Sequence, residues 1–192
     1  YSQGKLMRRI TLTMILLLSS TAATNVDASS YQLRDGSIVD PIQSVEGGDL
    51  SYSGNNLEPG AELYFAELRG AALLFADLTS ADLRAAQLDG AMLIAADLTN
   101  ARLTSAELPS ADLTNAHLTG ADLTGADLIS ANLSGADLYN ADLTGADLAG
   151  ADLTGADLSG VSSGGINGTP QTLPTNWQVT NGYLIAVSYT HL

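Results

Sequence analysis

Residues 111–150 read ADLTN AHLTG ADLTG ADLIS ANLSG ADLYN ADLTG ADLAG, and this five-residue phrase recurs from Ala61 to Gly160. That stretch holds twenty pentads, each of which opens with Ala and has Leu at its third position. The second position is mostly Asp or Glu, and the last two are mostly Thr or Ser followed by Gly. A fixed sequence period is the signature of a repeat architecture, so the period decides the fold.

A period of five fits neither an α-helix nor a flat strand. Five residues turn a helix by about 500°, so successive Leu residues would wind around its whole surface. On a strand, an odd spacing would send alternate Leu residues to opposite faces. The frequent Gly residues would also cost a helix roughly 1 kcal/mol each. The chain must therefore turn a corner once per pentad.

A coil made of short sides satisfies every position of the pentad. We expect Leu to point inward at the middle of each side, and Ala to point inward beside a corner that has room for a methyl group only. The other three positions face solvent, and the Ser/Thr-Gly pair supplies the turn because Gly tolerates a positive φ. Stacked coils pair like strands, and each coil adds about 4.8 Å of height.

The A-(D/N)-L-x-x pattern resembles the pentapeptide-repeat family over about half of the chain. The resemblance implies an all-β fold, a right-handed quadrilateral β-helix (a pentapeptide-repeat solenoid) with four pentads per coil and about five coils. Such a rod is expected to be roughly 24 Å tall at the strand spacing. Because neighbouring coils bury each other, single coils are not expected to fold alone.

The composition argues against several classes of function. The chain has no Cys, and therefore no disulfide, thiolate metal site or Cys nucleophile. Its net charge is −14, with only 7 Lys and Arg and none after Arg102, which argues against nucleic-acid binding through a basic surface. A hydrophobic fraction of 45% argues against disorder in the repeat block.

The first 60 residues divide into two segments. Residues 1–28 comprise upstream read-through before Met7 and then a basic start, a short apolar run and small residues, as in a secretory signal peptide. The apolar run is too short for a stable membrane span; an N-terminal anchor or a buried helix is the alternative. We expect an exported protein, periplasmic or extracellular, cleaved after Ala23 or Ala28. Residues 29–60 are assigned to a lead-in that caps the first coil, with a short strand at residues 37–41.

The C-terminal part departs from the pentad at Val161. Residues 161–186 hold a loop rich in Ser, Gly, Thr and Pro, then two expected strands around an Asn181-Gly182 turn. We assign this segment to a C-terminal cap or to a connector between repeat blocks, which it resembles in exported members of the family. Trp177 is expected to cover the last coil in preference to forming a ligand platform.

Two further features concern the same end of the chain. Residues 182–185, GYLI, echo residues 36–39, GSIV, in the segment that leads into the repeat block. Residues 187–192 resemble one reading frame of a sequencing adapter and are excluded from functional argument.

Four pentads per coil place residues twenty apart in one column. Each column is interrupted by at least one residue that is not acidic, such as His117, which relieves the repulsion between stacked carboxylates. One carboxylate per level supplies too few oxygens for Ca²⁺, and a convex rod offers no cleft, so we predict no metal site, no cofactor and no catalytic residues. The acidic columns hold Asp77, Asp97, Asp137 and Asp157; Asp122 and Asp142; and Asp127 and Asp147.

One face of the predicted rod begins with apolar residues. An exposed apolar patch usually has something that covers it. The candidates are the lead-in folding back over the patch and a partner protein, including a second copy of the chain in a homodimer. The residues expected to point outward there are Ala72, Leu74, Phe75, Met92 and Ile94.

These features favour a non-enzymatic, exported repeat scaffold or protein-interaction module of unknown ligand. The alternative is an acidic rod that mimics DNA and inhibits a type II topoisomerase, as some members of the resembled family do. Fourteen second-position acids over ~24 Å give one per ~1.7 Å, close to the charge spacing of duplex DNA. A second alternative, a surface- or ice-binding array, is weaker because Thr104, Thr124 and Thr144 form a single file.

Overall fold

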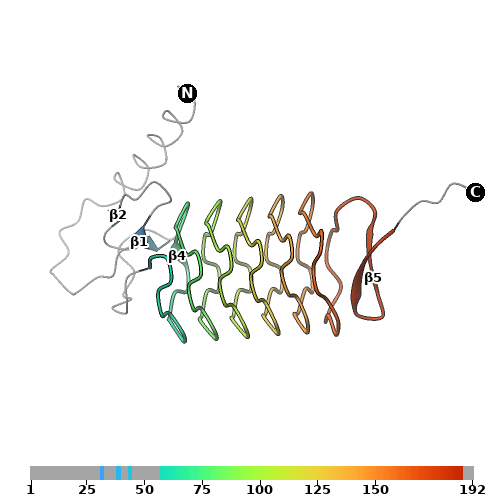
Figure 1. The fold of residues 1–192 in the computed structure, drawn as a ribbon, viewed down its shortest axis with the longest axis horizontal. Coiled ribbons are helices and arrows are strands. Elements are labelled where there is room, and N and C mark those ends of the chain that lie inside the picture. The colour runs from blue at the N-terminus through green and yellow to red at the C-terminus, as the bar shows by residue number, and fades with distance from the viewer. Residues whose placement is uncertain (1–30, 33–37, 40–42, 45–56, 188–192) are drawn as a thin grey trace, which may run out of the picture.

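The computed structural model describes residues 31–32, 38–39, 43–44 and 57–187. Most of this chain consists of single β-bridges separated by two-residue turns, one bridge and one turn per pentad. Figure 1 shows the coils stacked along one axis, with β1 and β2 at the N-terminal end and β5 at the C-terminal end. The strands within the described residues are β1 (Tyr31–Gln32), β2 (Ile38–Val39), β3 (Gln43–Ser44), β4 (Ala71–Ala72), β5 (Trp177–Thr180) and β6 (Tyr183–Ala186).

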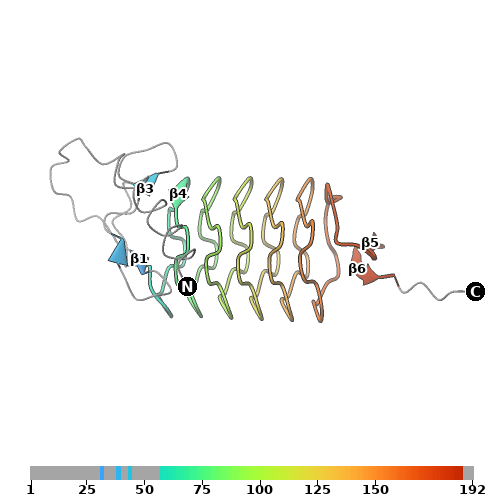
Figure 2. The same ribbon diagram turned by 90° about the horizontal axis from the view of Figure 1, so that it is seen from above.

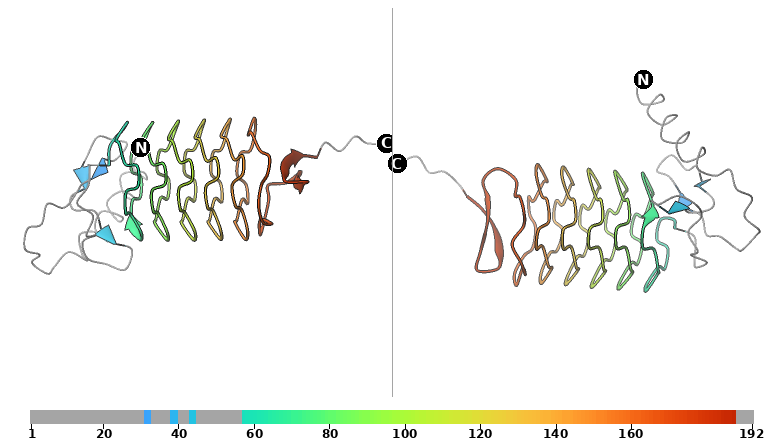
Figure 3. Two further views of the ribbon diagram at one scale, coloured as in Figure 1. Left: turned by 90° about the horizontal axis from the view of Figure 1, so that it is seen from below. Right: turned by 180° about the vertical axis from the view of Figure 1, so that it is seen from behind.

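The coils stack through parallel bridges between residues twenty apart. Glu62 pairs with Asp82, Asp82 with Arg102 and Arg102 with Asp122, and the same register holds in the other columns. Backbone hydrogen bonds join the coils, as where the Leu63 N–H donates to the Asp82 carbonyl at 2.8 Å. The predicted twenty-residue columns are confirmed, and the block is a β-helix whose turns form one continuous stack in the views from above, below and behind (Figures 2 and 3).

The core is a ladder of Leu and Ala side chains. Every third-position Leu from Leu63 to Leu158 is at most 1% exposed, and every first-position Ala except Ala61 is buried. The expected inside and outside positions of the pentad are therefore confirmed. Burying a Leu side chain stabilises a fold by about 2 kcal/mol before chain entropy is subtracted, so the stack is stable only as a unit.

Each corner is a tight turn whose fifth residue has a positive φ. The Ala66 N–H donates to the Leu63 carbonyl at 3.0 Å and closes a turn around Tyr64 and Phe65. A positive φ at the third residue of such a turn is the mark of type II, which favours Gly. All twenty fifth positions have it, including Phe65 at 59° and Ala85 at 53°, so the fold imposes this conformation even where no Gly is present.

The pentad motif ends at Gly160, but the backbone register does not. The expectation that the register breaks at Val161 is wrong for the backbone, because the bonds between coils need peptide groups and not the pentad side chains. In this last turn Ile166 is buried at an Ala position and Gly168 takes a Leu position. The bridges that continue the register are Asp142–Ser162, Asp147–Asn167 and Asp152–Thr172.

An antiparallel hairpin of β5 and β6 covers the last turn. Asn181 and Gly182 both have a positive φ, 52° and 77°, as the predicted Asn-Gly turn of type I′ requires. Leu184 is 6% exposed, and Trp177 packs against the core, as expected of a capping residue. The Ile166 N–H donates to the Gly182 carbonyl at 3.0 Å, which ties the hairpin to the turn before it.

The lead-in contributes three short strands. β1 pairs antiparallel with β2, which confirms a strand within residues 37–41, and β3 pairs antiparallel with β4 in the first turn of the helix. The predicted signal peptide and residues 188–192 lie outside the described residues. Within the described ranges, no helix has the length and apolar character needed to cross a membrane.

Candidate functional site

The second position of the pentad carries most of the charge, and its side chain bonds to its own corner. In all twelve pentads with Asp or Asn there, Oδ1 accepts the backbone N–H of the residue two positions later, at 2.9 to 3.4 Å. This arrangement is an Asx turn. Asn132 makes it as the eleven Asp residues do, so the bond needs a carbonyl-type oxygen and not a charge.

These side-chain bonds complete the hydrogen bonding of the backbone. In pentad 121–125, the Thr124 N–H donates to Asp122 Oδ1 at 3.0 Å, while the neighbouring N–H groups donate to backbone carbonyls. Pro109, which has no N–H, takes the same fourth position after Glu107, which has too long a side chain for an Asx turn. Because nearly every backbone N–H in a fold finds an acceptor, the acidic columns are part of the fold itself.

We predict that Asp147→Ala costs about 1 kcal/mol of unfolding free energy, as the loss of a helix N-cap does, because the Ala149 N–H loses its acceptor at 3.0 Å. Asp147→Asn should cost far less, since the amide oxygen replaces the carboxylate. Urea unfolding of the three proteins measures both differences. An Asn variant as unstable as the Ala variant would show that charge, and not the Asx turn, is what Asp147 contributes.

Hydrogen bonds hold several of these carboxyls ionised. Hydrogen bonding by Thr154 and Thr172 lowers the pKa of Asp152 to about 2; the Thr154 N–H and the Thr172 hydroxyl donate to its Oδ1. Ser159 likewise lowers the pKa of Asp157. Burial alone would raise the pKa of Asp122, but hydrogen bonds from its Thr neighbours outweigh that and lower it.

The lowered pKa of Asp152 predicts a loss of stability in acid. Because the folded pKa lies below the value of about 3.9 in an unfolded chain, ionised Asp152 stabilises the fold above pH ~4 and this contribution disappears as the pH falls through about 2. Asp152→Asn removes the titration, so its unfolding free energy should fall less than that of the wild type between those pH values. Parallel curves from urea unfolding at each pH would contradict this assignment.

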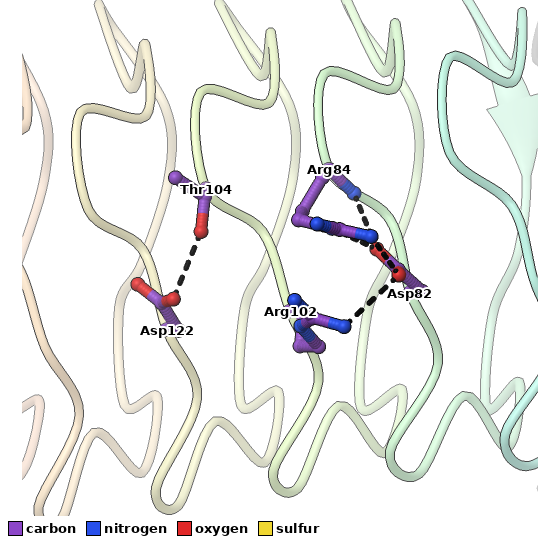
Figure 4. Close-up of polar contacts among 5 residues, drawn as sticks. All are labelled: Asp82, Arg84, Arg102, Thr104 and Asp122. Carbon is purple, nitrogen blue, oxygen red and sulfur yellow. Dashed lines mark hydrogen bonds and ion pairs between the residues drawn. The ribbon is translucent and has the colours of Figure 1, made fainter.

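Arginine side chains neutralise the columns only in the N-terminal half of the block. Asp82 accepts from Arg84 Nε at 2.7 Å and from Arg102 Nη1 at 3.2 Å (Figure 4). The Arg84 hydrogen bond holds the pKa of Asp82 below its usual value. Arg69 pairs with Asp89 on a neighbouring side of the rod, at 3.1 Å. Since no Lys or Arg follows Arg102, the negative charge gathers in the C-terminal half.

The structure brings the predicted acidic residues together in their columns. His117 bridges Asp97 and Asp137 in one of them, as the spacing predicts. Among the residues that the structure describes, no group of three or more His, Cys, Asp or Glu side chains could hold a metal ion. The remaining acidic bridges are Asp77–Asp97, Asp137–Asp157, Asp122–Asp142 and Asp127–Asp147.

The predicted apolar patch lies at the N-terminal end of one column. Ala72 is 8% exposed and pairs with Gln43 of the lead-in, so at this residue the lead-in covers the patch, which is one of the two alternatives given above. The covering element is β3, which adds a strand to the first turn at this point. Phe75 is 40% exposed, and Leu74, Met92 and Ile94 are partly exposed.

An exposed aromatic pair, two columns away from this patch, was not predicted. Tyr64 and Phe65 are 59% and 63% exposed, and their ring centroids lie 4.6 Å apart. The Arg84 guanidinium, held by Asp82, lies 5.9 Å from the Tyr64 ring centroid. The signal was present in the first pentad, where two aromatic residues stand at the fourth and fifth positions, which in most other pentads hold small or polar residues.

The repeat block is similar in sequence to known proteins. The family model for pentapeptide repeats matches in 8 copies, over residues 59–93, 81–120 and 121–160. The chain is 36% identical to HetL, a pentapeptide repeat protein involved in heterocyst differentiation regulation in the cyanobacterium Nostoc; the match covers 54% of this chain and 56% of HetL, with a TM-score of 0.40. No curated protein sequence matches the chain.

Two other solved structures are similar. Rfr23, a pentapeptide repeat protein from the cyanobacterium Cyanothece, is 42% identical over 51% of this chain and 62% of its own, with a TM-score of 0.38. QnrB1, a plasmid-mediated fluoroquinolone resistance protein, is 23% identical over 51% of this chain and 64% of its own, with a TM-score of 0.22. The chain thus spans less than two thirds of each of these proteins.

The family match covers more than half of the chain, and the Ala and Leu positions that define the repeat form the buried ladder. The chain therefore belongs to the pentapeptide-repeat family.

Proposed function

We propose that the protein is a non-enzymatic interaction scaffold that is exported and presents one end of a rod of about five four-sided coils to a protein partner. The observation that carries this proposal is that the outward residues fall into two groups, those whose side chains bond to the backbone and those whose side chains do not. The second-position Asp carboxylates accept backbone N–H groups, whereas the Tyr64 and Phe65 rings protrude from the rod.

The aromatic pair has the chemistry of a protein-binding surface. Tyr, Phe and Arg are enriched at the centres of protein interfaces, where large rings bury area at little cost in conformational entropy. Arg84 is oriented by two bonds to Asp82, at 2.7 and 2.6 Å, so its guanidinium lies beside Tyr64 in a defined position. A partner that covers both rings would also desolvate this charge pair, which favours a partner with a hydrogen-bond acceptor opposite Arg84.

A photo-crosslinking amino acid at position 64 tests the proposal in the source cells. We expect a specific adduct from position 64 and none from position 139, since Tyr139 is 48% exposed but stands in the acidic half of the rod. Phe65→Ala should weaken the adduct from position 64 severalfold. Equal adducts from both positions, or none from either, would contradict the proposed surface.

Export rests on the sequence of residues 7–28 and has its own measurement. The mature protein should be recovered outside the cytoplasm, with Thr24 or Ser29 as its first residue. Recovery of uncleaved protein from the cytoplasm would argue against export and favour the alternative below.

The alternative function is inhibition of a type II topoisomerase by DNA mimicry. The density of carboxylates along the rod, close to the charge density of duplex DNA, supports this alternative. The Asx turns weaken that argument because they explain the acids by a need of the backbone, which Asn132 also satisfies. The Arg69 and Arg84 ion pairs further interrupt the charge in the N-terminal half. A supercoiling assay with the purified chain decides the matter, since a DNA mimic must inhibit at stoichiometric concentration.

A further inference from the structure

One side of the rod carries positive charge in its N-terminal half and negative charge in its C-terminal half. This side, the Glu62 face, consists of six stacked levels that begin at residues 61, 81, 101, 121, 141 and 161. Arg84 and Arg102 stand in the second and third levels, whereas Asp122 and Asp142 stand in the fourth and fifth. Figure 4 shows the side chains of the second to fourth levels on successive coils.

The two guanidinium groups cover the carboxylate that lies between them. Arg84 Nη2 lies 2.6 Å and Arg102 Nη1 lies 3.2 Å from Asp82 Oδ2. The Asp82 side chain is only 18% exposed, whereas those of Arg84 and Arg102 are 42% and 53% exposed. These two levels therefore present a cationic surface to solvent, in a chain whose net charge is −14.

The fourth and fifth levels present the opposite charge. Asp122 and Asp142 each accept a backbone N–H of their own corner through Oδ1, at 3.0 and 2.9 Å. Within the described residues, neither carboxylate has a Lys or Arg at ion-pair distance. Both therefore keep a negative charge that a cation from outside the chain can reach.

The shape of the Glu62 face follows the same division. Its first level carries the protruding Tyr64 and Phe65 rings, whereas the fifth positions of its last three levels are all Gly. The fourth position of the last level is Gly164, and a Cβ there would lie 3.1 Å from the Tyr183 ring, which is 52% exposed. The N-terminal half of the face is thus bulky, and the C-terminal half is flat with an aromatic ring at its end.

We propose that two copies of the chain associate side by side and antiparallel through their Glu62 faces. The second copy is then the partner of the surface around Tyr64 and Phe65, and this assignment rests on the function proposed above. A two-fold axis across the middle of the face, perpendicular to the rod, gives an interface in which both copies use the same residues. It places the first level of one copy against the sixth of the other, the second against the fifth and the third against the fourth.

Each charged or bulky level then meets its complement. Arg102 faces Asp122 of the second copy, and the Arg84 guanidinium, which covers Asp82, faces Asp142 of the second copy. The rings of the first level face the glycines of the last level beside Tyr183, where aromatic rings pack favourably. A parallel pair of rods would instead place Arg102 against Arg102. Five steps of about 4.8 Å make the face about 24 Å tall, which is small for an interface and predicts a weak dimer, with a Kd in the micromolar range.

Sedimentation equilibrium of the purified full chain should show a monomer–dimer equilibrium that weakens as salt is added, because salt screens exposed charge pairs. Arg102→Glu and Asp122→Lys should each raise the Kd by about tenfold or more, since each places like charges opposite one another. An equimolar mixture of the two variants should restore the dimer, because the mixed pair has opposite charges at both contacts. Asp127→Lys is the matched control: it makes the same change at the same level of the neighbouring side, and also removes an Asx turn, but should leave the Kd unchanged.

A photo-crosslinking amino acid at position 64 of the purified chain separates this dimer from the function proposed above. We expect an adduct with twice the mass of the chain, mapped to residues 161–186 of the second copy. An adduct with a different protein in the source cells, and none between copies, would overturn the dimer and leave the partner surface intact, whereas no adduct at all would overturn both. Variants that all dimerise equally, or a mixture that fails to restore the dimer, would overturn the antiparallel arrangement.

Discussion

Leu123→Asp should unfold the repeat block. Leu123 is 1% exposed within the ladder. Removing this buried side chain should lower the unfolding free energy by about 2–5 kcal/mol. Placing an unpaired carboxyl in the apolar core should lower it by several kcal/mol more. The sum approaches the whole stability of an ordinary domain, about 5–15 kcal/mol. Because each turn is stable only against its neighbours, a defect in the middle turn should abolish the cooperative transition seen by circular dichroism.

Two variants separate the parts of this effect. Leu123→Ala should cost about 2–5 kcal/mol and leave a folded, less stable rod, since it leaves a cavity without a charge. Thr124→Asp places the same carboxyl on the adjacent, partly exposed residue, where repulsion from Asp122 in water is about 1 kcal/mol or less. Equal loss of thermal stability in the 123 and 124 Asp variants would refute the inside and outside assignment of the pentad.

Gly168→Ala should detach the C-terminal cap from the rod. Gly168 has a φ of +70°, and a Cβ there would meet the backbone N and Cα of Ala149 at 2.6 Å, too close for any real contact. The left-handed conformation alone costs a non-Gly residue about 1–2 kcal/mol, and the overlap adds about 1–3 kcal/mol because a backbone must shift. The strain falls on the turn that carries β5 and β6.

The lone Trp of the chain reports this event, since Trp177 packs against the core from β5. In Gly168→Ala its fluorescence transition should precede the circular dichroism transition of the rod, whereas the two coincide in the wild type. Gly155→Ala is the matched control, because its φ is +68° and nothing lies within 4 Å of its added Cβ. If both variants lower the midpoint temperature of the Trp177 fluorescence transition equally, the contact between position 168 and Ala149 does not hold the cap in place.

Much of the site's geometry could be predicted from the pentad spacing together with the four pentads per coil that the family resemblance implies. The columns that hold Asp122 and Asp142, and the break at His117, follow from twenty residues per turn, since a strict period repeats the same neighbours at every level. The exposure of Tyr64 and Phe65 was equally open to prediction from their pentad positions. For Ala72 the sequence left two covers open, the lead-in and a partner, because β3 has no pentad pattern and pairs through peptide groups; in the structure the lead-in covers it.

The sequence by itself determined which side chains are buried, since a five-residue period with Leu and Ala in constant positions has one solution that hides both. It also determined the β5–β6 hairpin, because Asn181-Gly182 favours a turn with two positive φ values. Only the tertiary structure decided that the stack of parallel bridges runs past Gly160 to Thr172, and that Asp side chains accept the N–H groups left over at the corners of their pentads. Both depend on backbone hydrogen bonding between turns, which any residue type can supply and which composition therefore does not reveal.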